Sequence, residues 1–293
     1  MRLDSGEVGE GSAASTANPP KERERCYERW RRRPTVNPTS GNSIRRLLQS
    51  RGLLSYRSLV RYRATTQGTT SRPAERETRM DDLLPNHIDT VLFDLGGVLV
   101  CDPWESLLLA PDRGLADRLD LDRATVERVG HSLWRHYSIR PASESHYWKT
   151  LASELDVGLT SEFIAQLEAE LLFANPRAEE ILNRMSEQGV RIGIISDNTS
   201  FWYPKQARLI GLEPYLEPKL SFLSYVFGVH KDLEGRGLFD IAARKTNPGS
   251  TLVVDDRPQN VTRALHHHFR ALEYSMHRSF NFFESVAQYE DRE

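Results

Sequence analysis

Three short apolar runs in this 293-residue sequence each end in a polar residue, and this repeated pattern constrains the fold most. The runs are DTVLFDL (89–95), VRIGIISD (190–197) and TLVVDD (251–256), and their β-branched residues predict buried strands. Helical patterns separate the runs, so we expect a parallel sheet with right-handed crossovers. In such a sheet the polar strand ends share the edge outside which ligands bind.

Two further runs, PKLSFLSY (218–225) and FRALEY (269–274), complete the predicted sheet. Helices are predicted at 176–189, 236–246 and 258–268. Strands that alternate with helices in this way predict an α/β fold with a doubly wound, Rossmann-like parallel sheet.

The interval between the first two strands contains helical patterns alone, at 122–137, 143–155 and 160–173. We therefore predict a helical cap at 102–175, inserted into a core made of 80–101 and 176–293. An insertion directly after the first strand is expected to stand over the ligand-binding edge as a lid.

The first 79 residues differ in charge from the rest of the chain. They hold 17 Lys+Arg and 8 Asp+Glu, whereas residues 80–293 hold 22 and 33. We interpret 1–79 as a disordered basic leader without a folded role, and expect the compact domain to begin near Met80. An organelle transit peptide is one alternative, disfavoured by the acids between residues 4 and 28. A nucleic-acid or anionic-membrane arm is another, and we do not expect a nucleic-acid partner.

Two cysteines, Cys26 and Cys101, fit a reducing compartment, and we expect a cytoplasmic protein. No apolar stretch approaches the roughly 18 residues that suggest a transmembrane helix, so no membrane span is expected. Nothing in the sequence sets the oligomeric state.

Four motifs occur in order: DLGGV with Asp94, IISDN with Ser196, GVHKD with Lys231, and VVDDRPQN with Asp255 and Asp256. Taken singly, each has an ordinary interpretation, such as a turn residue, a helix cap or a surface lysine. Together they resemble the haloacid dehalogenase-like (HAD) hydrolase superfamily over residues 90–275. The opening motif resembles the branch that contains sugar-phosphate phosphatases and the phosphatase domains of epoxide hydrolases.

The resemblance implies an Mg²⁺-dependent phosphatase. Asp94 would attack phosphorus to form an aspartyl-phosphate, and would bind Mg²⁺ through its second oxygen. Asp256 would be a further ligand, with Asp255 adjacent or bridged by water, and the backbone carbonyl of Gly96 would also contribute. Mg²⁺ prefers hard oxygen ligands of this kind.

The same resemblance implies a phosphate site. Ser196 would hydrogen-bond a phosphoryl oxygen, and Lys231 would neutralise the phosphate as a point charge. Asp197, also assigned to this site, stands where the family commonly has asparagine, and it adds negative charge. Asp232 follows the lysine where a proline is usual.

Gly96 is the main departure from the family pattern. Most phosphatases of the family carry a second aspartate there, which protonates the leaving oxygen and later activates water. Such general acid–base catalysis is typically worth about 10²–10⁴-fold in rate. Either a cap residue replaces it, or the substrate has a good leaving group, or the protein mainly binds. The candidate cap residues are Glu144, His131, His136 and Tyr147.

We therefore predict hydrolysis of a small phosphorylated metabolite through Asp94. One alternative is a HAD-fold protein that binds a phosphorylated ligand or partner with little or no turnover. Another is a 2-haloacid dehalogenase, which also lacks the second aspartate and needs no metal. The adjacent carboxylates Asp255 and Asp256 repel each other without a cation, which favours the phosphatase over the dehalogenase.

Overall fold

A computed structural model describes residues 87–278 and 282–290. The predictions for the leader at 1–79 and for a domain start near Met80 lie outside these residues.

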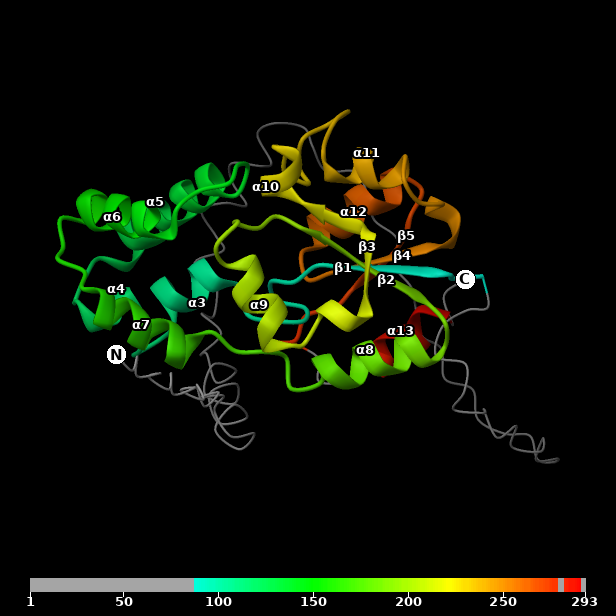
Figure 1. Cartoon of the computed structure of the whole chain (residues 1–293), viewed down its shortest axis with the longest axis horizontal. Coiled ribbons are helices and arrows are strands. Elements are labelled where there is room, and N and C mark those ends of the chain that lie inside the picture. The colour runs from blue at the N-terminus through cyan, green and yellow to red at the C-terminus, as the bar shows by residue number, and fades with distance from the viewer. Residues whose placement is uncertain (1–86, 279–281, 291–293) are drawn as a thin grey trace, which may run out of the picture. The chain divides into compact units, whose positions relative to one another are not determined.

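The centre of the fold is a five-stranded sheet in the order β3-β2-β1-β4-β5, and every neighbouring pair is parallel (Figure 1). The strands are β1 (Thr90–Phe93), β2 (Arg191–Ser196), β3 (Leu216–Leu223), β4 (Thr251–Asp255) and β5 (Arg270–Glu273). Four of them lie within the runs that the sequence singled out, and β3 begins two residues before its run, which starts at Pro218. The predicted doubly wound α/β fold is confirmed.

Helices cover both faces of the sheet. Side chains of a strand alternate between the two faces, so apolar residues reach helices on each side. Val91 and Phe93 of β1 pack in a cluster with α8 (Ala178–Glu187) and α13 (Phe282–Glu290). Leu92 points to the other face and packs with α11 (Leu238–Ala243) and α12 (Pro258–His266). Strand β1 is thus buried at every position and on both faces, as is usual in parallel sheets.

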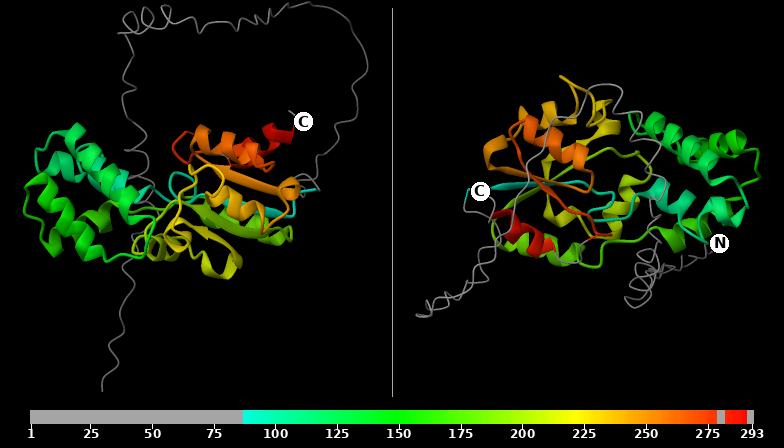
Figure 2. Two further views of the ribbon diagram at one scale, coloured as in Figure 1. Left: turned by 90° about the horizontal axis from the view of Figure 1, so that it is seen from above. Right: turned by 180° about the vertical axis from the view of Figure 1, so that it is seen from behind.

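The interval between β1 and β2 is helical up to α8, as predicted. Its helices are α3 (Pro103–Leu109), α4 (Leu115–Arg118), α5 (Arg123–Tyr137), α6 (Glu144–Leu155) and α7 (Ser161–Leu171). Helices α3 and α4 were not foreseen. Figure 2 shows the group in green beside the sheet. We call residues 102–175 the cap, following the predicted boundaries.

The cap has a hydrophobic cluster of its own, which includes Trp134, Tyr147 and Trp148. Trp202 joins that cluster from the segment between β2 and α9 (Tyr203–Leu209), and its side chain is fully buried. Polar contacts also hold the cap to the core. Ser138 Oγ lies 2.8 Å from His230 Nε2, and Lys205 Nζ lies 2.6 Å from Glu144 Oε1.

Within the part of the chain that the structure describes, no helix combines the length and the apolar character that a bilayer crossing demands.

Candidate active site

Asp94 follows β1 directly and lies at the carboxyl edge of the sheet. Its backbone N–H donates to Val254 of the neighbouring strand β4 at 2.8 Å, so the residue continues the sheet although β1 ends before it. Its Oδ1 accepts a hydrogen bond of 2.7 Å from the Leu95 backbone N–H. The residue is 8% exposed. Asp94 is therefore a buried, oriented carboxylate with one oxygen directed toward other groups of the site.

The two glycines after Asp94 form a tight turn, in which the Leu95 carbonyl accepts from the N–H groups of Val98, Leu99 and Val100. Gly97 has φ of +74°, a left-handed conformation that favours glycine. A Cβ atom on Gly97 would lie 2.4 Å from Asp256 Oδ2. The second glycine of the motif thus gives the Asp256 carboxylate room beside the turn.

Lys231 is buried at the centre of the site. Its Nζ lies 2.7 Å from Asp255 Oδ2 and 2.9 Å from Asp94 Oδ2, and its side chain is 1% exposed. Burial alone would lower the lysine pKa, but the carboxylates of Asp255, Asp94 and Asp197 raise it above its ordinary value. Lys231 therefore stays charged, and the interpretation as a surface lysine is excluded.

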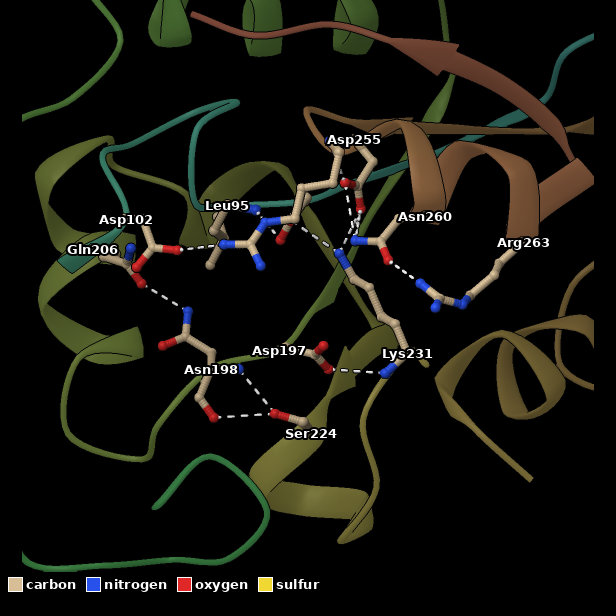
Figure 3. A network of polar contacts seen from close by, with 12 residues as sticks. Leu95, Asp102, Asp197, Asn198, Gln206, Ser224, Lys231, Asp255, Asn260 and Arg263 are labelled. Carbon is tan, nitrogen blue, oxygen red and sulfur yellow. Dashed lines mark hydrogen bonds and ion pairs between the residues drawn. The ribbon is translucent and has the colours of Figure 1, made fainter. Parts of the chain in front are cut away.

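Asp255 uses both of its oxygens to hold neighbouring groups (Figure 3). Oδ2 accepts from Lys231, and Oδ1 accepts from the Arg257 backbone N–H at 2.9 Å. The Asn260 side-chain amide lies 3.1 Å from each oxygen. Burial raises the Asp255 pKa, while Lys231 opposes this shift. Asp255 therefore orients the lysine and the start of α12.

The Asp256 carboxylate has fewer hydrogen-bond partners than the Asp255 carboxylate. Its Oδ1 is buried without a hydrogen-bond partner among the described residues. Burial, Asp94 and Asp255 raise the pKa of Asp256 to about 7. Asp94, Asp255 and Asp256 each offer a carboxylate oxygen, and these oxygens lie within 4.8 Å of one another. The cluster carries excess negative charge that a divalent cation would offset.

The predicted phosphate residues divide into two groups. Lys231 and Asp197 line the cavity next to Asp94, together with Asn198. Ser196 is buried at the end of β2, 1% exposed, and is not among the described residues that line this cavity. Asn198, which the sequence reasoning did not assign, takes a fixed position because its amide donates to Gln206 Oε1 at 2.7 Å (Figure 3).

Asp197 accepts a hydrogen bond of 3.0 Å from the Lys231 backbone N–H through Oδ1. Burial raises the pKa of Asp197 to about 7, although the charge of Lys231 opposes this shift. Asp197 thus positions the Lys231 backbone, and its own carboxylate is buried away from water.

Asp102 also lines the cavity, and the sequence reasoning missed it. Its Oδ2 lies 3.1 Å from Arg257 Nη2, and its Oδ1 has no hydrogen-bond partner among the described residues. Burial and the nearby Glu105 raise the pKa of Asp102 well above its usual range. The only sequence signal was an aspartate before a proline, which is typical of a helix start.

The four cap residues considered as acid candidates lie elsewhere. Glu144 pairs with Lys205, His136 contacts Arg140, and His131 packs near Trp104 and Trp134. Tyr147 is fully buried in the cap cluster. None of the four lines the cavity beside Asp94 in the described part of the chain.

The cavity beside Asp94 has a volume of about 20 Å³. This is room for about one water molecule or one ion. Trp134 lines it from the cap, and the Arg257 guanidinium carbon lies 5.9 Å from the centre of the Trp134 ring. The arrangement has room for a small cation beside the Asp94 carboxylate.

We expect Gly97→Ala to lower the free energy of unfolding by about 1–3 kcal/mol, because an alanine there is strained and its Cβ displaces Asp256. Urea unfolding measures the change. Gly158→Ala is the matched control, since a Cβ at that position meets nothing within 4 Å. Equal stability of the two variants would contradict the role assigned to the turn.

We expect Asp197→Asn to stabilise the metal-free protein in a pH-dependent way. The raised pKa means that folding favours protonated Asp197. Its contribution is full below 3.8 and is lost as pH rises through about 7. The neutral asparagine avoids this loss, so its advantage in unfolding free energy grows over that window to a few kcal/mol.

Denaturant unfolding at several pH values, with a chelator present, measures the difference between wild type and the Asp197→Asn variant. Glu154→Gln, on an exposed face of α6, removes a carboxylate of the same charge and should show no such trend. A constant difference across the pH range would contradict the burial of an ionisable Asp197.

No protein-family model matches the sequence, and no curated protein matches it significantly. Solved structures match it in fold. A predicted HAD-like family hydrolase from Porphyromonas gingivalis has a TM-score of 0.52 at 20% identity, covering 71% of this chain and 99% of that chain. The magnesium complex of a HAD family enzyme from Bacteroides thetaiotaomicron has a TM-score of 0.53 at 15% identity, covering 65% and 94%.

L-2-haloacid dehalogenase from Xanthobacter autotrophicus is a more distant match, with a TM-score of 0.41 at 19% identity, covering 63% of this chain and 76% of that chain. At such identities the two closer matches bear on the fold alone. With the sheet order and the helical insertion described above, they establish that this chain has the fold of the haloacid dehalogenase-like (HAD) superfamily.

Proposed function

We propose that the protein is an Mg²⁺-dependent phosphatase that hydrolyses a small phosphomonoester through an aspartyl-phosphate on Asp94. One observation carries the proposal. The Asp94 carboxylate lies 2.9 Å from the buried Lys231 ammonium and belongs to a cluster of three acids whose oxygens lie within 4.8 Å. A nucleophilic carboxylate next to a fixed cation and a metal-binding cluster suits attack on an anionic phosphate.

The residues present fit a magnesium ion. Asp256 offers a buried oxygen without a partner in the described chain, and Asp94 lies in the same cluster. We assign these two carboxylates and the Gly96 backbone carbonyl as ligands. Asp255 already holds Lys231 and Asn260, so it would act next to the ion or through water. A bound Mg²⁺ would neutralise phosphate charge and screen Asp94 from it.

The remaining steps belong to the chain itself. Asp94 attacks phosphorus, and Lys231 keeps the phosphoryl group close by charge. Asp197 holds the Lys231 backbone through its hydrogen bond, and Ser196 stays a predicted phosphate contact. Asp102, Pro103 and Trp134 line the cavity from the cap, so we infer that the cap contacts a substrate bound at Asp94. The lid expected from an insertion after the first strand stays a prediction.

Further inferences are more specific than the assignment of the fold. The opening FDLGGVLV motif supports placement in the branch of sugar-phosphate phosphatases and epoxide-hydrolase phosphatase domains. The neighbour from Bacteroides thetaiotaomicron was solved with magnesium, which supports the choice of cofactor. A small phosphorylated metabolite is the proposed substrate class, and a cytoplasmic location remains a prediction.

A phosphate-binding protein with little turnover is the second candidate. Gly96 and Asp197 favour it, because the first removes an acid and the second adds a buried negative charge to the phosphate site. A metal-free dehalogenase is less favoured, because the crowded carboxylates of Asp94, Asp255 and Asp256 call for a cation.

We expect Asp94→Asn to lower kcat for phosphomonoesters by at least about 10³-fold, because the amide is a poor nucleophile. A colorimetric assay of phosphate release from a panel of phosphorylated metabolites with Mg²⁺ measures the change. The fold should persist, since Lys231 keeps its bond to Asp255.

Thermal unfolding of the Asp94→Asn variant is the control for folding. Activity near the wild-type level in a folded variant would overturn the mechanism. Binding of phosphorylated metabolites by wild type without turnover would favour the second candidate instead.

A further inference from the structure

The missing acid at position 96 leaves a space that another residue fills. A Cβ atom on Gly96 would lie 3.4 Å from Asp102 Oδ2 and 3.5 Å from the Asp102 Cβ. The Asp102 carboxylate therefore lies where the first atoms of a side chain at position 96 would point. Both residues line the cavity beside Asp94.

The local structure does not explain the Asp102 side chain. Asp102 is the N-cap residue of α3, a position where aspartate normally accepts a backbone hydrogen bond from the first turn. Here the side chain makes no capping hydrogen bond within the described chain. Its Oδ2 faces Arg257, and its buried Oδ1 has no partner among the described residues. The carboxylate is thus directed to the cavity and away from the helix.

The backbone around Asp102 is held by contacts outside the cap helices. Val100 bridges to Gly96 on one side and to Ala174 on the other. The Cys101 N–H donates to the Phe173 carbonyl at 2.9 Å, and the Gln206 side chain donates to the Cys101 carbonyl at 3.0 Å. These contacts hold the backbone before Asp102, so the residue lines the cavity beside Asp94 without depending on the cap helices beyond it.

Arg257 holds the carboxylate from the other side. Its guanidinium lies 3.1 Å from Asp102 Oδ2 and 3.7 Å from Glu105 Oε1. Glu105 is the more exposed of the two acids, with 41% of its side chain exposed against 16% for Asp102. Since Arg257 has two acidic partners, loss of one does not leave it unpaired. Ion pairing can therefore be separated from a role in proton transfer.

We propose that Asp102 supplies the general acid and base that Gly96 does not, a role that rests on the proposed phosphatase function. As Asp94 Oδ forms its bond to phosphorus, the bond from phosphorus to the ester oxygen breaks. That oxygen takes the proton of the Asp102 carboxyl and leaves as the alcohol. The Asp102 carboxylate then takes a proton from water as that water attacks phosphorus. The Asp94–phosphorus bond breaks, and inorganic phosphate is released.

The test compares two probe substrates in rapid-quench experiments with Mg²⁺. Glycerol phosphate has a poor leaving group and needs the acid, whereas p-nitrophenyl phosphate releases a phenolate that does not. For Asp102→Asn we expect the first turnover of glycerol phosphate to slow by about 100-fold. The first turnover of p-nitrophenyl phosphate should change by less than about 10-fold.

A second readout is independent of steady-state activity. Without the base, water attack becomes slow, so Asp102→Asn incubated with p-nitrophenyl phosphate should accumulate phosphorylated enzyme. Intact-protein mass spectrometry after acid quench detects the added phosphoryl group. A role confined to ion pairing would not produce this species.

Two matched variants complete the design. Glu105→Gln removes the other partner of Arg257 and should leave both first turnovers unchanged. In the double variant Gly96→Asp with Asp102→Asn, a carboxylate returns from the neighbouring position. The contacts of 3.4 Å or more around a Cβ on Gly96 leave room for it. This variant should regain at least about 10-fold in the glycerol phosphate turnover.

Equal slowing of both substrates in Asp102→Asn, or no slowing of either, would overturn the assignment while leaving the phosphatase intact. A wild-type protein that hydrolyses neither substrate nor any phosphorylated metabolite would instead refute the proposed function, and the role of Asp102 with it. The two failures are distinct because the first appears only in variants.

Discussion

The site depends on one buried ammonium group. Lys231 Nζ lies between Asp255 and Asp94, where its charge makes it possible to bury both carboxylates. A buried charge without a partner costs far more than an exposed one, so each of the three groups requires the others. Asp255 is the anchor of this arrangement, because Arg257 and Asn260 also donate to it. Asp94 is thus held in place by a cation that is itself held by Asp255 at the end of β4.

The sheet creates this neighbourhood, since β1 and β4 pair in register from Thr90 with Thr251 to Phe93 with Val254. Asp94 and Asp255 follow these last paired residues and therefore emerge side by side. The turn after Asp94 then brings Gly97 against Asp256, so the third carboxylate also faces the cluster. Charge accumulates there because topology brings acids from two strands together, and Lys231 alone does not balance it.

Most of the fold and part of the site could be predicted from the sequence. Apolar period and β-branched content predicted all five strands, and motif order predicted which strand ends would meet. Residues whose roles depend on contacts between distant parts of the chain could not be predicted from the sequence. From the sequence, Asp102 is typical of a helix cap. Its position in the site depends in part on Gln206, whose side chain donates to the Cys101 carbonyl across 105 residues of sequence. Asn198 was missed for the same reason, because its orientation comes from Gln206 and Ser224.

The same geometry explains why glycine is suited to position 96 in this chain. An aspartate there would begin 3.4 Å from Asp102 Oδ2, and two carboxylates so close resist joint ionisation. Asp94 and Asp256 already add negative charge around the Asp102 carboxylate, and Arg257 is its nearby counterion. A further acid in that space would exceed what one guanidinium can offset. In the proposed mechanism, an acid at position 96 and an acid at position 102 are therefore alternative solutions to one requirement, and Asp102 would be the second.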